Sequence, residues 1–99
     1  MQVDWRPEAR AELREILEYI VGRNLVAASD LNEAAEAATT ALPQHPYLYR
    51  LGRIPGIRES VVHPNYLVVY RVTDRIEILT VLHARQEYPS GSVDYFARP

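Results

Sequence analysis

Residues 57–72 decide the fold, and they read IRESVVHPNYLVVYRV. Two runs rich in β-branched and aromatic residues flank the turn signal His63-Pro64-Asn65. This pattern predicts a β-hairpin. A second turn, Thr73-Asp74-Arg75, leads into residues 76–83, whose nearly continuous apolar character predicts a third strand that is covered over most of its area.

Two amphipathic helices are predicted upstream of these strands. The short alternating run Gln2-Val3-Asp4-Trp5 predicts a first strand, and Pro7 is well suited to the first turn of a following helix. Apolar residues then recur at spacings of three and four as far as Gly22. Asn24 can cap a second helix, which an alanine-rich stripe extends to Pro43.

The predicted order is strand, two helices and three strands, an α+β arrangement in which a sheet covers the apolar side of the helical hairpin. Residues 43–55 hold three prolines, one glycine and no periodicity, which predicts a loop or an irregular crossing segment. The chain of 99 residues suffices for one compact domain and is too short for two. We expect that domain over residues 1–89, and a tail over residues 90–99 that is mobile or becomes ordered on a partner.

Composition excludes several classes of protein. The chain has no cysteine, which rules out disulfides and thiolate metal sites, and no apolar stretch long enough to span a membrane. We therefore expect a soluble, cytoplasmic protein without membrane contact. His45 and His63 lie beside prolines with no partner at metal-ligand spacing, so neither a metal nor another cofactor is expected.

The net charge of −2 is divided unevenly along the chain. The first 49 residues carry four arginines and eight carboxylates, whereas residues 50–99 carry seven arginines and five carboxylates. The stretch from Arg50 to Arg71 holds four arginines and one acid, Glu59, and is the best candidate for an anion-attracting surface. We interpret Glu59 as an exposed carboxylate that balances these arginines. The pI of 5.9 argues against strong nonspecific binding of nucleic acid.

Four segments, taken in order, resemble a known family. They are Trp5-Arg6-Pro7-Glu8-Ala9, residues 52–59 (GRIPGIRE), residues 64–72 (PNYLVVYRV) and residues 81–86 (VLHARQ). Together they resemble the RelE/ParE superfamily, the toxins of bacterial type II toxin–antitoxin modules, over roughly residues 2 to 89. The resemblance implies a helical hairpin packed on a twisted antiparallel sheet, and a cognate antitoxin as partner in a toxin–antitoxin hetero-oligomer.

The resemblance also implies one of two activities. RelE-like members cleave messenger RNA in the ribosomal A site with the 2′-hydroxyl as nucleophile, whereas ParE-like members poison DNA gyrase. For RNA cleavage without a metal, Arg58 and Arg85 are candidate phosphate clamps, and His83 and Tyr88 are candidate proton-transfer groups. The alternative interpretation of His83 is a hydrogen-bonded structural residue at a strand end.

Two positions depart from the RelE-like pattern. Leu67 stands where RelE-like nucleases usually carry an arginine, and Ser60 where a lysine is common. Loss of one cationic catalytic side chain commonly costs a few kcal/mol of transition-state stabilisation. The prediction is therefore a ParE-like gyrase poison whose target-binding residues are Arg50, Arg53, Arg58 and Arg85. The alternatives are a RelE-like, ribosome-dependent mRNA endonuclease, which alone would be an enzyme, and an inactive remnant that only binds the antitoxin.

Overall fold

The computed structural model describes residues 1–88, so the predicted tail over residues 90–99 lies outside the described part of the chain. The helices and strands follow the predicted order, with one short strand added. The helices are α1 (Pro7–Val21) and α2 (Leu25–Ala41), and the strands are β1 (Val3–Trp5), β2 (Arg50–Leu51), β3 (Ile57–His63), β4 (Tyr66–Val72) and β5 (Ile76–His83). This confirms the predicted α+β fold. Within residues 1–88, no helix has the length and apolar character to cross a membrane.

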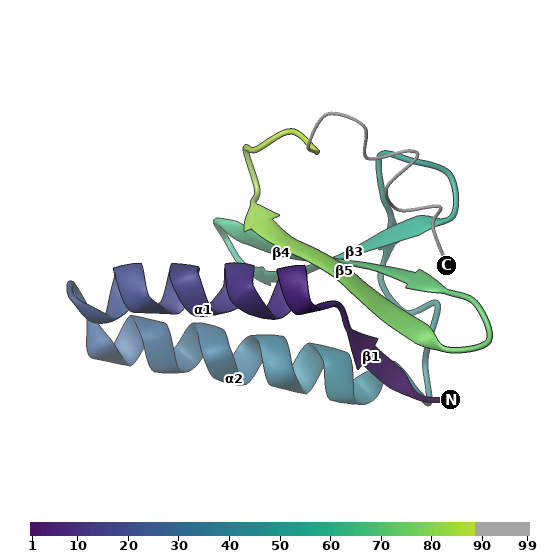
Figure 1. Cartoon of the computed structure of the whole chain (residues 1–99), viewed down its shortest axis with the longest axis horizontal. Coiled ribbons are helices and arrows are strands. Elements are labelled where there is room, and N and C mark those ends of the chain that lie inside the picture. The colour runs from purple at the N-terminus through teal and green to yellow at the C-terminus, as the bar shows by residue number, and fades with distance from the viewer. Residues whose placement is uncertain (89–99) are drawn as a thin grey trace.

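The five strands form one mixed sheet in the order β1-β5-β4-β3-β2, with both helices packed on one of its faces (Figure 1). Strand β1 runs parallel to β5, with Val3 opposite Ile76, and the other neighbouring strands are antiparallel. Strand β2 lies inside the segment that was expected to be a loop. Its two residues are too few to show an alternating pattern, which is why the sequence does not reveal it.

The helix ends follow the local signals in the sequence. Pro7 occupies the first turn of α1, where its missing N–H removes a donor that would have no partner inside the helix. The Asn24 side chain accepts a hydrogen bond from the backbone N–H of Ala27 at 3.1 Å and caps α2, as predicted. The two helices therefore form a tight hairpin, whose turn extends past the sheet (Figure 1).

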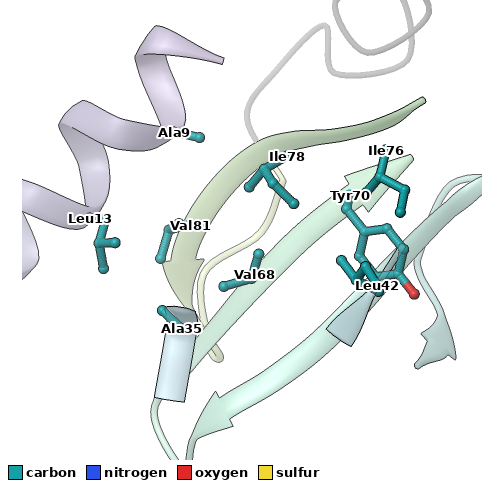
Figure 2. Close-up of a cluster of buried hydrophobic side chains, with 9 residues drawn as sticks. All are labelled: Ala9, Leu13, Ala35, Leu42, Val68, Tyr70, Ile76, Ile78 and Val81. Atoms are coloured by element: carbon teal, nitrogen blue, oxygen red, sulfur yellow. The ribbon is translucent and has the colours of Figure 1, made fainter. Parts of the chain in front are cut away.

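The main core lies between the helical hairpin and the sheet (Figure 2). The small side chains of Ala9 and Ala35 are fully buried there, which lets both helices approach the strands closely. Figure 2 shows these residues facing apolar side chains of β4 and β5. The buried members of this core are Ala9, Leu13, Ala35, Leu42, Val68, Tyr70, Ile76, Ile78 and Val81.

A second apolar cluster covers the opposite face of the sheet. Because side chains alternate along a strand, Leu67 and Val69 of β4 point away from the helices, whereas Val68 and Tyr70 point toward them. The second cluster consists of Ile57, Leu67, Val69, Leu79 and Leu82, with Ile54, Ala84 and Tyr88 packed against it. Burial on both faces explains the nearly continuous apolar character of β4 and β5.

Candidate functional site

Glu59 lies at the centre of a charged cluster, and its expected exposure is wrong: the residue is 4% exposed. Its Oε1 accepts hydrogen bonds from Arg50 Nε at 3.1 Å and pairs with Arg50 Nη2 at 3.0 Å. Its Oε2 pairs with Arg53 Nε at 3.2 Å and accepts a hydrogen bond from the Tyr88 hydroxyl at 2.6 Å. We call Arg50, Arg53, Glu59 and Tyr88 the Glu59 cluster.

The sheet edge explains why this carboxylate is buried. Strand β2 pairs with β3 so that Arg50 lies directly opposite Glu59, and this brings the guanidinium onto the carboxylate. The cluster therefore depends on the one strand that the sequence did not reveal. The signal that was available is the position of Glu59 as the one acid among four arginines.

The Tyr88 hydroxyl keeps its proton at neutral pH. Burial, together with the hydrogen bond that its hydroxyl donates to Glu59, raises the pKa of Tyr88 to about 12. Gly52 makes room for this phenol, because a Cβ at position 52 would lie 2.7 Å from the Tyr88 hydroxyl oxygen. The phenol is therefore protonated at neutral pH and donates a hydrogen bond to a carboxylate of its own chain.

Arg53 ties the segment after β5 to the sheet. Its Nη1 donates to the carbonyl of Gln86 at 2.6 Å and its Nη2 to the carbonyl of Ala84 at 3.4 Å. Its guanidinium also lies over the Tyr88 ring, 4.8 Å from the centroid. The backbone N–H of Ala84 donates to the carbonyl of Asn65 at 2.7 Å. Residues 84–88 are thus fixed from two sides.

Arg85 projects from this fixed segment. Its backbone N–H donates to Nδ1 of His83 at 3.1 Å, and its side chain is exposed. None of the carboxylates in residues 1–88 forms an ion pair with Arg85. A guanidinium in this position is free to contact an anionic group on another molecule.

Arg58 lies on the other face of the sheet. It stands opposite Tyr70, whose ring belongs to the core under the helices. Its Nη1 donates to the carbonyl of Tyr49 at 2.8 Å and to that of Tyr47 at 3.4 Å, and its guanidinium lies 5.0 Å from the centre of the Tyr47 ring. Arg58 therefore holds the segment before β2 in place. Arg71, the last arginine of the stretch from Arg50 to Arg71, pairs with Glu77 at 2.8 Å.

His83 is a hydrogen-bonded residue at the end of β5. Its Nδ1 accepts from the backbone N–H of Arg85, and its ring meets that of Tyr66 edge-on at 5.5 Å. His63 has the same arrangement, because its Nδ1 accepts from the backbone N–H of Asn65 at 3.0 Å. In the part of the chain that the structure describes, no group of three His, Cys, Asp or Glu residues is placed to hold a metal ion.

The four candidates for RNA cleavage are not gathered around one point. Arg58 stands opposite Tyr70 and His83 opposite Tyr66, four residues apart on β4, which corresponds to about 13 Å along the strand. Strands β3 and β5 also flank β4 on opposite sides. Arg58 faces the helices, whereas Tyr88 packs on the other face. The structure does bring together Arg50, Arg53 and Tyr88, through Glu59.

Two helices on one face of a five-stranded mixed sheet define a fold shared with several solved structures. The chain from "Chromosomal ParDE TA system from P. aeruginosa" has a TM-score of 0.68 and 24% identity, and the match covers 84% of this chain and 95% of that one. "The structure of YoeB dimer from Staphylococcus aureus" gives a TM-score of 0.58 and 14% identity, with 89% of this chain and 98% of that one covered. At these identities the likeness concerns the fold.

The family itself is shown by sequence. Residues 3–88 match the family model described as "ParE toxin of type II toxin-antitoxin system, parDE". A relative named "Putative toxin Y4kP", from Sinorhizobium fredii (strain NBRC 101917 / NGR234), is 36% identical over 89 residues, covering 89% of this chain and 93% of the relative. The chain belongs to the ParE toxin family of type II toxin–antitoxin systems.

Proposed function

We propose that this toxin arrests growth by poisoning DNA gyrase in the cytoplasm, and that a cognate antitoxin neutralises it in a hetero-oligomer. The ParE family match supports the antitoxin partner and favours gyrase as the target. Solved complexes of related fold, such as "Crystal structure of the E. coli DinJ-YafQ toxin-antitoxin complex", support an antitoxin as partner (TM-score 0.55).

The dispersal of the four nuclease candidates is the observation that carries the choice of gyrase over messenger RNA. RNA cleavage without a metal needs a base, an acid and cations around one phosphate. Here Arg58 and His83 are separated along β4, and Arg58 and Tyr88 lie on opposite faces. Tyr88, with its pKa raised to about 12, is no base at neutral pH. Such a surface is better suited to an inhibitor, which only binds its target, than to a nuclease.

Arg85 is the residue of this surface that we expect to contact gyrase. It is exposed on a segment that Arg53 and Tyr88 fix against the sheet, so its guanidinium is presented with little loss of backbone entropy on binding. Arg53, which donates to the carbonyls of Ala84 and Gln86, contributes positive charge next to this segment, partly neutralised by Glu59.

Two assays run side by side test the proposal. The purified chain is added to gyrase with relaxed plasmid, and to ribosomes programmed with a defined messenger RNA. We expect loss of supercoiling, accumulation of cleaved DNA and intact RNA. Arg85→Ala should weaken the inhibition, whereas Arg75→Ala, an exposed arginine paired with Asp4 and Asp74, should not. Codon-specific RNA cleavage with unaffected gyrase would overturn the proposal.

A further inference from the structure

A groove lies between α1 and the ends of β4 and β5, and Gln86 in its lining accepts a hydrogen bond from Arg53 of the Glu59 cluster. It has a volume of about 420 Å³, which is within the usual range of small-ligand pockets. Helix α1 contributes the carboxylates of Glu12 and Glu15 together with the Tyr19 ring, and the strands contribute the rings of Tyr66 and His83. Ile16, Val81, Leu82 and Gln86 complete the lining. We call it the α1 groove.

The carboxylate of Glu12 is fixed in this groove without a positive partner. Both of its oxygens accept from the Thr80 hydroxyl, at 2.8 and 2.9 Å, and Oε1 also accepts from the backbone N–H of Val81 at 3.3 Å. Within residues 1–88, no arginine forms an ion pair with Glu12 or Glu15. The Glu12 carboxylate is thus oriented by two neutral donors, the Thr80 hydroxyl and the backbone N–H of Val81.

The surroundings of Glu12 disfavour its negative charge. Burial raises the pKa of Glu12 above its ordinary value, the charges of Glu15 and Glu8 raise it further, and the hydrogen bonds from Thr80 and Val81 oppose this effect. A cation that entered the groove would offset both the desolvation of Glu12 and its repulsion by Glu15.

The aromatic walls favour the same kind of ligand. Tyr66 and His83 meet edge-on with ring centroids 5.5 Å apart, and the hydrogen bond from the backbone of Arg85 fixes the imidazole. Ring faces attract guanidinium and ammonium groups. The chain already shows this attraction at Tyr19, which lines the groove, because the Arg23 guanidinium lies 3.9 Å from the centre of the Tyr19 ring.

We propose that the α1 groove binds an arginine or lysine side chain of the cognate antitoxin, which is the partner assumed by the proposed function. Charge favours this occupant over a second copy of the chain. The groove lining contains the carboxylates of Glu12 and Glu15 and no arginine, so two copies that met through it would bring like charges together. The two α1 carboxylates of the groove then serve a basic partner, and the exposed Arg85 serves the target.

The probe is a short peptide, acetyl-Leu-Arg-Ala-Leu-amide, titrated into the ¹⁵N-labelled full chain and followed by NMR. We expect shift changes in α1 around Glu12 and Glu15 and at Tyr66 and residues 81–86. The same peptide with Gln in place of Arg should bind about tenfold more weakly, as should the Arg peptide to the E12Q/E15Q variant. The matched control is E33Q/E36Q, which removes two carboxylates of α2 and should leave the affinity unchanged.

Three results would overturn the proposal. The first is equal binding of the Arg and Gln peptides, and the second is equal weakening by E33Q/E36Q and E12Q/E15Q, which would show a general charge effect. The third is self-association that depends on Glu12 and Glu15. Because Glu12 also contacts β5, the single variant E15Q tests the groove without removing the bonds to Thr80.

The test is independent of the target. The gyrase assay contains no antitoxin, so E12Q/E15Q should inhibit gyrase as the wild-type chain does. If the peptide does not bind but the chain still inhibits gyrase, the groove proposal is refuted and the gyrase proposal is not. Peptide binding by a chain that leaves gyrase unaffected would refute the gyrase proposal alone.

Discussion

Glu59→Gln should be the most informative single substitution in the chain, because it keeps the shape of a buried side chain and removes its charge. Glu59 is 4% exposed, whereas the side chains of its partners Arg50 and Arg53 are 59% and 39% exposed. Breaking a fully buried ion pair by removing one partner costs about 3–5 kcal/mol. Since water can still reach both guanidinium groups, we expect a smaller loss, about 2–3 kcal/mol.

Urea unfolding followed by circular dichroism measures this loss. In a domain of this size, such a loss lowers the melting temperature by roughly 4–8 °C per kcal/mol. The matched control is Glu36→Gln, because Glu36 pairs with Arg10 at 3.1 Å but both side chains are about half exposed, at 48% and 49%. Exposed pairs contribute about 0–1 kcal/mol. If both variants lose the same free energy of unfolding, the Glu59 cluster does not stabilise the fold as its geometry indicates.

Three further substitutions test other parts of the structure. Gly52→Ala should destabilise by about 1–3 kcal/mol, because its Cβ would lie 2.7 Å from the Tyr88 hydroxyl, whereas Gly22→Ala, with its nearest atom at 3.9 Å, should be tolerated; equal melting temperatures would contradict this. In a spectrophotometric titration, Tyr88→Phe should remove one phenol that ionises near pH 12, and an unchanged titration curve would contradict this. Since the pKa of Tyr88 is raised, its contribution to stability is present below pH 10 and is lost as the pH rises through about 12. The pKa of Glu12 is also raised, so its ionisation opposes folding, and the stability of the wild type should fall relative to Glu12→Gln as the pH rises above the ordinary carboxyl pKa; a parallel pH profile of the two proteins would argue against this.

The fold was predictable where periodicity is strong. The alternating strands, the two helices, the Asn24 cap and the stop at Pro43 all depend on interactions within a few residues, and the sequence records these directly. Strand β2 has only two residues, and the parallel pairing of β1 with β5 joins opposite ends of the described chain. Neither leaves a local pattern, so these features required the structure.

The sequence predicted which residue types the candidate site contains, but not how they contact one another. The excess of arginine between Arg50 and Arg71 indicated an anion-attracting surface, but not which arginines are already paired. Pairing depends on the opposition of β2 and β3 and on Tyr88, which is 29 residues from Glu59 in the chain. Long-range contacts of this kind made the expectation of an exposed Glu59 wrong.

The pairing pattern ranks the arginines for any anionic target. Arg50 and Arg53 share the carboxylate of Glu59, and Arg58 donates to backbone carbonyls of the segment before β2. An incoming anion must compete with these internal acceptors, whereas at Arg85 it meets an exposed guanidinium without a carboxylate partner in residues 1–88. Substitutions at Arg50, Arg53 and Arg58 should therefore act mainly by loosening the sheet edge, and Arg85→Ala by removing a contact from an intact fold. Unfolding curves measured beside inhibition curves separate these two effects, because only Arg85→Ala should lose inhibition at unchanged stability.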